Sequence, residues 1–505
     1  MKALRRLAAV LALAAGFAGP ALAQKSADTL RISWRDAVPN VDPYYNTQRN
    51  GIILADLAWD GLLYRDPATG QIGPGLATEW RQVDDTTLEF TLRAGVTFHN
   101  GDAFTAEDVA YTVNTLLADP RIVTPSNYAF LAGAEVIDAQ HVRLRLKRPF
   151  PPALNVIAAI MPIWPSAYRA RIGAEAYAKA PVGTGPYRML PITGPGEIAL
   201  ERFDAHYPAS PKGRPAIRRL VIHQVADVTT EMAELLGNRA DWISDFPADQ
   251  FDNIARLPTL QAVRAEVQRV TYLNMDAAGR SGAGNPLTNL KVRQAIAHAI
   301  DRETLAAQFM PGGSHVLNIA CFPGEFGCDQ SAGVHYPFDP AKARALLAEA
   351  GFANGVELDL YSYLPGIWTG AIQNYLAAAG ITARTHTMSA GAVIQLAQQG
   401  KLPLAFAGWG GFAVNDVSAF LGYFYTKGSF AMAYDDEVTA LVTEGARILD
   451  TERRRALYDQ AFRLITERAY FLPLFTYVKT YGFSRQLDFT PWPDDNPRFY
   501  RARWK

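Results

Sequence analysis

The chain has 505 residues, 49% of them hydrophobic, and its 49 basic side chains equal its 49 acidic ones in number. A chain of this length and composition can bury large cores, and we expect it to form two or three lobes. The balanced charge excludes a general electrostatic attraction to nucleic acid or to anionic membranes.

Residues 1–23 have the three parts of a secretory signal peptide. A positively charged segment (2–6) precedes an uncharged apolar run (7–17), and Ala21-Leu22-Ala23 matches the small-x-small pattern of a cleavage site. The apolar run is too short to span a bilayer as a mature helix, and a buried N-terminal helix is the alternative. We expect Sec export to a periplasm and cleavage before Gln24. No cysteine lies near this site to carry a lipid anchor.

The first predicted elements are three strands and a helix. Residues 29–34, 88–92 and 142–146 alternate between apolar and polar side chains, as half-buried strands do. Between the last two, Thr105 is followed three residues later by Asp108, a pattern typical of a capped helix start.

Two further helices are marked in the second half of the chain. Residues 291–300 place apolar side chains on one face, and His298 within them is interpreted as a packed or surface residue. Asp339 and Pro340 begin a helix that ends before Gly351. Helices and strands alternate through the chain, so the predicted class is mixed α/β.

Cys321 and Cys328 are the two cysteines of the chain, and both lie in one loop-like stretch rich in glycine and proline. In an oxidising compartment this favours a local disulfide, and two free thiols are the alternative. No further ligand at a usual spacing accompanies them, so no metal site is expected.

The sequence lacks the common catalytic and cofactor motifs. It has no G-x-S-x-G elbow, no H-E-x-x-H motif and no phosphate loop. Gly183-Thr-Gly185 begins like a dinucleotide fingerprint, but Pro186 follows and position 188 is arginine. We expect no catalytic residue and no cofactor. The alternative is a secreted hydrolase whose carboxylates meet in space.

Ten segments carry a family resemblance, in order, over nearly the whole mature chain. They are DGLL (60–63), DPATG (66–70), PGLA (74–77) with Trp80, FTLRAGVTFHNG (90–101), FTAEDV (104–109), PVGTGPY (181–187), VRQAIAHAIDR (292–302), YPFDPAKAR (336–344), GWG (408–410) and LPLF (472–475). This ordered set resembles the family 5 extracellular solute-binding proteins of ABC importers, a group of dipeptide, oligopeptide and nickel-chelate receptors.

The resemblance implies a two-lobed periplasmic-binding-protein fold of type II, or cluster C, with an extra subdomain in the first lobe. Lobe I would comprise 24–62, 185–276 and 471–505, the inserted subdomain 63–184, and lobe II 277–470. The chain would cross between lobes near 275–280 and 470–480. A monomer would close on a solute in the interlobe cleft and deliver it to an ABC permease in the membrane.

The resemblance also places the binding site around Trp409. Peptide receptors of the family carry an aspartate three residues after this tryptophan, which pairs with the ammonium group of the peptide. Here the position is Phe412, so that contact is missing. Asp416 is a candidate replacement, with a capping or surface role as its alternative, and Asn415 is either a pocket contact or a turn residue.

Four weaker candidates for ligand contact complete the set, and for each of them a structural role is the favoured interpretation. They are Val38 and Asn40 in the turn after the first strand, Tyr128, and Asn274 before the first crossing.

The predicted ligand is a peptide-like or other small polar solute. An opine-like or modified-peptide ligand would suit the missing ammonium partner, and a nickel chelate is disfavoured because no histidine lies near Trp409. The sequence does not separate transport from a sensory or chaperone-like role.

Overall fold

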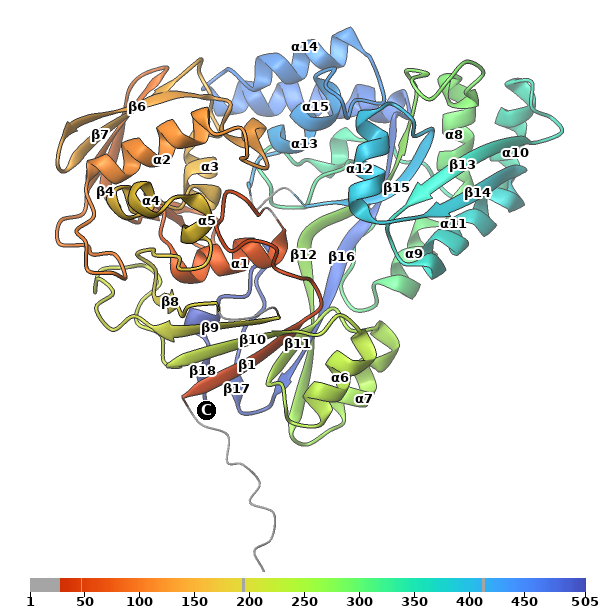
Figure 1. The fold of residues 1–505 in the computed structure, drawn as a ribbon. Coiled ribbons are helices and arrows are strands. Elements are labelled where there is room, and N and C mark those ends of the chain that lie inside the picture. The colour runs from red at the N-terminus through yellow and green to blue at the C-terminus, as the bar shows by residue number, and fades with distance from the viewer. Residues whose placement is uncertain (1–27, 47, 193–195, 411–413) are drawn as a thin grey trace, which may run out of the picture.

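The computed structural model describes residues 28–46, 48–192, 196–410 and 414–505. It has two lobes joined by a pair of long strands, with lobe II at the right of Figure 1. The predicted signal peptide and Phe412 lie outside the described residues. Within the described part of the chain, no helix combines the length and apolar character needed to cross a membrane.

One sheet runs through both lobes in the strand order β14-β13-β15-β12-β16-β11-β1-β10-β9-β8. Its strands are β1 (Thr29–Trp34), β8 (Tyr187–Met189), β9 (Glu197–Arg202), β10 (Arg219–Gln224), β11 (Trp242–Ser244), β12 (Leu260–Met275), β13 (Val356–Ser362), β14 (Ile381–Thr387), β15 (Leu404–Trp409) and β16 (Phe471–Ser484). β12 and β16, the two longest, are antiparallel neighbours at its centre (Figure 1).

These two central strands connect the lobes. One half of β16 pairs with β11 of lobe I, and one half of β12, from Val270 onward, pairs with β15 of lobe II. Between the halves the β12–β16 register shifts twice, from Val267 to Val270 and from Val270 to Tyr272. Such irregularities bend and twist a strand pair, so this is where the two lobes are articulated.

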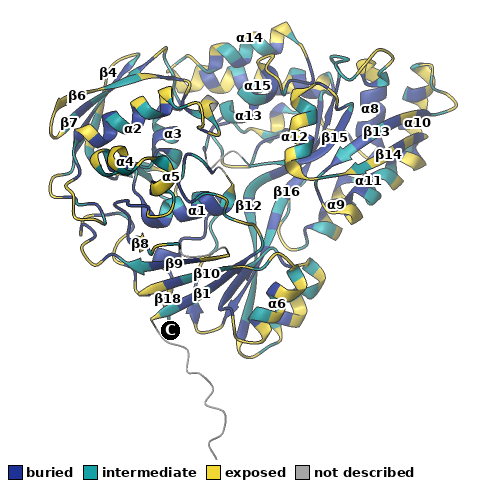
Figure 2. Cartoon of the chain, viewed as in Figure 1, coloured by how far each residue is buried: buried dark blue, intermediate teal, exposed yellow. Residues whose placement is uncertain are grey.

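Lobe I and the subdomain beside it share one hydrophobic core (Figure 2). The subdomain contains a second sheet in the order β4-β5-β7-β6, covered by α2. The elements of this part are α1 (Arg49–Ala58), β2 (Leu63–Arg65), β3 (Ile72–Pro74), β4 (Ala77–Asp84), β5 (Thr87–Leu92), α2 (Ala106–Ala118), β6 (Leu131–Asp138), β7 (His141–Leu146), α3 (Ala153–Ile160), α4 (Ser166–Ile172), α5 (Ala174–Tyr177), α6 (Val228–Leu236), α7 (Phe251–Ala255), β17 (Leu487–Asp488) and β18 (Arg503–Trp504).

Lobe II packs helices around β13, β14 and β15 and has separate cores. Its helices are α8 (Leu290–Ala299), α9 (Arg302–Phe309), α10 (Pro340–Glu349), α11 (Gly366–Ala378), α12 (Ala390–Gln398), α13 (Ser418–Tyr425), α14 (Asp436–Gly445) and α15 (Thr451–Glu467). Short 3₁₀ turns lie at Pro125–Tyr128, Ala248–Gln250, Pro286–Thr288, Gln330–Ala332 and Phe499–Arg501.

The local sequence signals correspond to elements of the structure. The predicted strands at 88–92 and 142–146 lie within β5 and β7. Thr105 N donates to Asp108 Oδ2 at 2.8 Å in the capping box of α2. Asp339 accepts from Lys342 N at 2.8 Å ahead of α10. These predictions are confirmed, because short-range hydrogen bonds decide where such helices begin.

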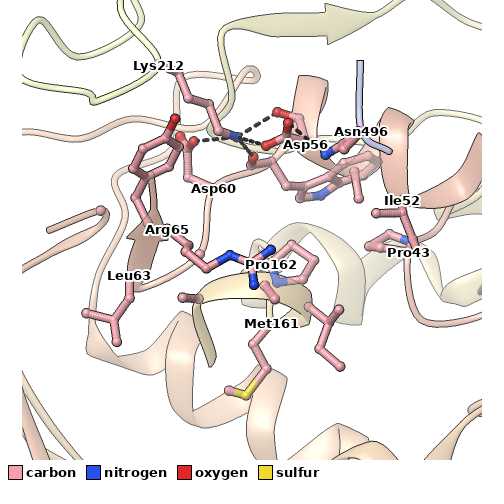
Figure 3. A pocket seen from close by; sticks show the side chains of 18 of the residues that line it. Pro43, Ile52, Asp56, Asp60, Leu63, Arg65, Met161, Pro162, Lys212 and Asn496 are labelled. Carbon is pink, nitrogen blue, oxygen red and sulfur yellow. Dashed lines mark hydrogen bonds and ion pairs between the residues drawn. The ribbon is translucent and has the colours of Figure 1, made fainter. Parts of the chain in front are cut away.

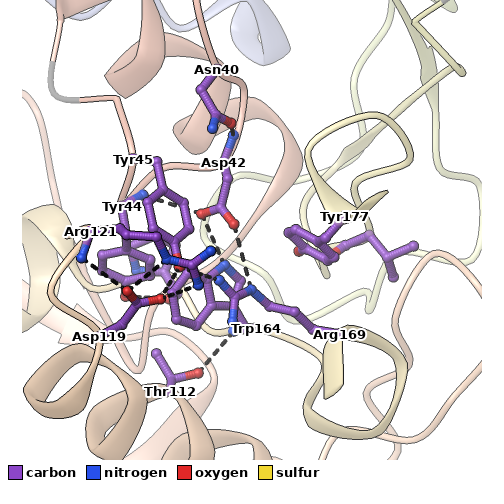
Figure 4. Close-up of polar contacts among 12 residues, drawn as sticks. Asn40, Asp42, Tyr44, Tyr45, Thr112, Asp119, Arg121, Trp164, Arg169 and Tyr177 are labelled. Carbon is purple, nitrogen blue, oxygen red and sulfur yellow. Dashed lines mark hydrogen bonds and ion pairs between the residues drawn. The ribbon is translucent and has the colours of Figure 1, made fainter. Parts of the chain in front are cut away.

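A buried polar network fastens the loop after β1 to the subdomain (Figure 4). The Asp42 carboxylate lies 3.5 Å from Arg169 Nε and accepts a hydrogen bond from Trp164 Nε1 at 3.2 Å. Arg169 Nη2 also donates to the hydroxyl of Tyr45 at 2.8 Å. Burial raises the pKa of Asp42 to about 6, although Arg169 acts in the opposite direction. The loop is therefore held by lobe-internal contacts.

Candidate ligand-binding cleft

A cavity of about 190 Å³ lies between the lobes, beside the articulated strands. Helix α1 forms its lobe I wall, β12 and β16 form its floor, and the ends of β13 and β15 form its lobe II wall. The lining residues are Arg49, Ile52, Arg269, Thr271, Tyr363, Leu364, Gly408, Gly410 and Tyr477. A small polar solute in this cavity would contact both lobes and the strands that connect them.

Arg269, on β12, presents a cation to this cavity. Its guanidinium has no hydrogen bond or ion pair with any residue that the structure describes, and its carbon lies 5.2 Å from the ring centre of Tyr477. Burial opposes the charge, but nearby acidic groups, Asp495 foremost, raise the pKa of Arg269. The side chain is therefore a permanent, partly buried positive charge without a direct anionic partner.

The carboxylate of Asp495 is already occupied by two other cations. Lys479 Nζ lies 2.9 Å from Asp495 Oδ1, and Arg49 Nε lies 3.5 Å from Asp495 Oδ2. Burial raises the pKa of Asp495, but Lys479, Arg49 and Arg269 together hold it lower, at about 2. Asp245 lies 3.7 Å from Lys479, and Asp494 and Glu231 are further carboxylates on which Arg49 and Lys479 act. Within the described part of the chain, Arg269 is thus the cation of this group that forms no ion pair, while Lys479 and Arg49 are paired with Asp495.

A second cavity, of about 110 Å³, lies in lobe I and shares Ile52 with the first (Figure 3). Lys212 in its wall donates to the carbonyl of Asp56 at 2.6 Å and lies 3.0 Å from Asp60. Arg65 lies 3.5 Å from Asp494, but its buried Nη1 atom has no hydrogen-bond partner. A polar cavity of this size has room for water, which can satisfy such an atom.

A family model described as "Bacterial extracellular solute-binding proteins, family 5 Middle" matches residues 71–431. The chain belongs to this family. The predicted class, a solute-binding receptor of an ABC importer, is therefore confirmed, and the family and its relatives are binding proteins, so a secreted hydrolase is not favoured.

Relatives and solved structures agree with this assignment over most of the chain. The glutathione-binding protein GsiB of Salmonella paratyphi A is 26% identical over 95% of this chain and 94% of its own length. Heme-binding protein A of Haemophilus influenzae is 28% identical, covering 80% of this chain and 78% of its own. The dipeptide-binding protein of Pseudoalteromonas sp. SM9913, solved with Met-Leu, has the same fold, with a TM-score of 0.81, 22% identity, and coverage of 94% and 100%. The predicted two-lobed fold is thus confirmed.

Trp409 ends β15 beside the cleft cavity, although its neighbours Gly408 and Gly410 are the ones that line it. Its half-buried indole packs against the rings of Phe420, Tyr423 and Phe424 on α13. The indole is therefore positioned by the lobe II core.

Asp416 is buried in lobe II, where both of its carboxylate oxygens already accept hydrogen bonds. Oδ2 accepts from Arg454 Nη2 at 2.8 Å, and Oδ1 accepts from Ser418 N at 3.0 Å. Asn415, by contrast, lies near the articulation, with its Oδ1 atom 3.5 Å from Gln268 Nε2 on β12. Of this pair, Asn415 is the residue nearer to the cleft floor.

The four weaker candidates occupy different surroundings. Asn274 is buried in β12, with neighbouring strands on both sides. Tyr128 lines the lobe I cavity and donates its hydroxyl to Ile160 O at 3.0 Å. Asn40 Oδ1 accepts from Asp42 N at 2.9 Å, and Val38 packs against the lobe I core. Neither Val38 nor Asn40 lines the cleft cavity.

Sequence reasoning missed Arg269 and Arg49, the two charged residues of the cavity lining. The available signal was Arg269 as the one charged residue between Val267 and Met275 of β12, where an arginine needs a reason to be half-buried. No group of three or more metal-ligating side chains gathers anywhere in the described ranges.

Proposed function

We propose that this receptor captures a small, peptide-like solute that carries a carboxylate, and that Arg269 binds this carboxylate in the interlobe cleft. The observation that carries the proposal is the unpaired guanidinium in a cavity lined by both lobes. A planar guanidinium binds a carboxylate through two parallel hydrogen bonds, which fixes the orientation of the solute.

The charge balance supports an anionic group in this position. A partly buried charge without a partner is costly, and the anion of a ligand removes that cost on binding. The Asp495 carboxylate is not the partner of Arg269, because it already pairs with Lys479 and Arg49. Glutathione and Met-Leu, which the names of two similar proteins mention, are both carboxylates.

The proposal also covers the export of the protein and the compartment in which it binds its solute. Residues 1–23 direct export, cleavage precedes Gln24, and the mature monomer works in the periplasm without catalysing a reaction. Lobe I (24–62, 185–276, 471–505) and lobe II (277–470) close on the solute about β12 and β16. The closed form is then the one that an ABC permease recognises.

Several residues that the resemblance names remain part of the proposed site. Trp409 and Asn415 flank the cavity, and Phe412 belongs to the short segment between them. Tyr128, Val38, Asn40 and Asn274 are proposed as more distant contacts with an extended solute.

The test is calorimetric titration of mature protein that has been unfolded and refolded to remove any retained solute. The titrants are glutathione and the twenty X–Leu dipeptides, each paired with its C-terminal amide. Because amidation removes the negative charge of the C-terminal carboxylate, we expect the X–Leu amides to bind at least about thirtyfold more weakly than the free acids. Amides that bind as tightly as the acids would contradict the proposal.

Two variants test whether the preference for free acids over amides depends on Arg269. Arg269→Gln keeps the length and polarity of the side chain but removes its charge, so it should weaken binding of the acids and leave the amides unchanged. Arg463→Gln, at an exposed position of α15, is the matched control and should behave as the wild type. Equal acid binding by Arg269→Gln would remove Arg269 from the site.

A further inference from the structure

The lobe I cavity and the cleft cavity adjoin each other. Ile52 of α1 lines both cavities, and Arg49, three residues earlier on the same helix, lines the cleft cavity. Arg49 Nη1 donates to the carbonyl of Asp494 at 3.1 Å, and Asp494 lines the lobe I cavity. A solute bound in the cleft cavity therefore has a second cavity next to it, on the lobe I side.

The charged side chains of the lobe I cavity form two groups. Of the described residues, three cations and three carboxylates line this cavity, so its lining is balanced as a whole. In the first group, Lys212 Nζ lies 3.3 Å from Asp56 and 3.0 Å from Asp60. One cation thus serves two carboxylates there, and the other two cations share the third carboxylate.

The second group consists of two arginines and one aspartate. Arg498 binds both oxygens of Asp494, with Nη1 2.7 Å from Oδ1 and Nη2 2.6 Å from Oδ2. Arg65, on β2, lies farther away, with its Nη2 atom 3.5 Å from Asp494 Oδ2. Because Arg498 already neutralises Asp494, the charge of Arg65 is only weakly compensated. Burial lowers the pKa of Arg65, but an arginine keeps its proton at neutral pH.

The guanidinium of Arg65 also has unused hydrogen-bonding capacity. Its side chain is 8% exposed, and the buried Nη1 atom has no hydrogen-bond partner among the described residues. Figure 3 shows this guanidinium in the space framed by the lining side chains, apart from the contacts of Lys212. An arginine in this position can donate its remaining N–H groups to a carboxylate inside the cavity.

We propose that the lobe I cavity receives a second acidic group of the solute and that Arg65 binds it. This inference rests on the proposed function: Arg269 binds the main-chain carboxylate in the cleft cavity, and the side chain of the preceding residue enters the lobe I cavity. The methylene groups of a glutamate side chain suit the apolar part of that lining, which includes Ile52 and Met161. The ligand class is thus a peptide-like solute with two carboxylates.

The test compares Glu–Leu with Gln–Leu by calorimetric titration of the refolded protein. The two dipeptides have nearly the same shape, and Glu–Leu carries the additional negative charge. Wild-type protein should bind Glu–Leu at least about tenfold more tightly than Gln–Leu. Lys–Leu, titrated in the same way, shows whether the carboxylates beside Lys212 attract a cationic side chain instead.

Variants of Arg65 assign the preference to its guanidinium. Arg65→Gln should remove the preference by weakening Glu–Leu alone, and Arg65→Lys should keep part of it. Because Arg498 retains Asp494, we expect Arg65→Gln to fold, and an unchanged affinity for Gln–Leu checks this. Arg148→Gln, at an exposed position after β7, is the matched control and should behave as the wild type.

Each outcome has a distinct meaning. If wild-type protein binds Gln–Leu or Lys–Leu as tightly as Glu–Leu, or if Arg65→Gln keeps the preference, the assignment of Arg65 is overturned while the role of Arg269 stands. If Arg65→Gln weakens Glu–Leu and Gln–Leu alike, Arg65 has a structural role and the assignment is likewise overturned. If no dipeptide binds, or Arg269→Gln changes nothing, the proposed function fails and this inference fails with it.

Discussion

Asp416 and Arg454 form an ion pair in lobe II whose side chains are only 2% and 5% exposed. Removing one member of such a pair leaves the other charge buried and unpaired, which costs about 3 kcal/mol or more. We predict that Asp416→Asn lowers the free energy of unfolding by about this amount, measured by urea denaturation, and that ligand affinity is nearly unchanged.

A double variant tests whether the loss of stability comes from leaving one buried charge without its partner. Asp416→Leu combined with Arg454→Leu removes both charges, so it should be less destabilised than the sum of the two single variants. A stable Asp416→Asn protein that has lost its affinity for the dipeptides would instead make Asp416 a ligand contact and contradict the prediction.

Glu231 on α6 is buried, and its ion-pair partner is Arg35, whose Nη1 atom lies 3.4 Å away. Burial raises the pKa of Glu231 from 4.5 to about 8. The native state therefore holds this proton more tightly than the unfolded chain does, and raising the pH through this range lowers the free energy of unfolding. Glu231→Gln keeps the neutral form at every pH. We predict that it flattens the pH dependence of urea unfolding between about pH 5 and pH 9, and an unaltered slope would contradict this.

At the scale of elements, the segment before β8 packs directly on the end of α1. A Cβ atom on Gly183 would lie 2.0 Å from the carbonyl oxygen of Ala58, a distance that requires the backbone to move. We predict that Gly183→Ala lowers the free energy of unfolding by about 2 kcal/mol or more. The control is Gly422→Ala within α13, where a Cβ has no neighbour within 4 Å, and it should be neutral or stabilising. Equal thermal midpoints for the two variants would show that α1 and this segment adjust freely.

Elements set by neighbouring residues were predictable from the sequence, and elements set by distant ones were not. The capping box at Thr105 and the start of α10 at Asp339 depend on hydrogen bonds spanning three residues. The charge of the cleft floor, in contrast, depends on Arg49 meeting Asp495 from the other end of the chain. Nothing in the local sequence pattern reveals that the Asp495 carboxylate pairs with Lys479 and Arg49. It also does not reveal that the Arg269 guanidinium has no ion-pair partner among the described residues.

The family resemblance predicted the two lobes and the region of the site, but not which side chains face the cavity. Asp416 was a reasonable candidate by position, and only the packing of α15 shows that Arg454 holds it. The position of the disulfide loop beside the segment after Trp409 was not predictable, because this contact depends on how the loop folds back.

At the scale of the molecule, β12 and β16 connect the two lobes, so we expect any relative motion of the lobes to occur about these strands. The register shifts in β12 lie between the lobe I and lobe II halves of the β12–β16 pair. A ligand moves the equilibrium between open and closed forms only by its preference for one of them. In the proposed site, a solute that contacts Arg269 on the floor together with both lobes provides that preference.

We therefore predict that a binding dipeptide shortens the distance between the lobes. Spin labels at Glu107→Cys on α2 and Ile367→Cys on α11 report it, because both positions are exposed and the native cysteines are paired. Double electron–electron resonance should show a shorter distance between the labels in the saturated protein than in the ligand-free protein. The C-terminal amide of the dipeptide at the same concentration should give no shift. The labelled Arg269→Gln protein should keep the ligand-free distribution when the free dipeptide is added. A saturated wild-type protein with an unchanged distance would mean that the cleft binds its solute without closing.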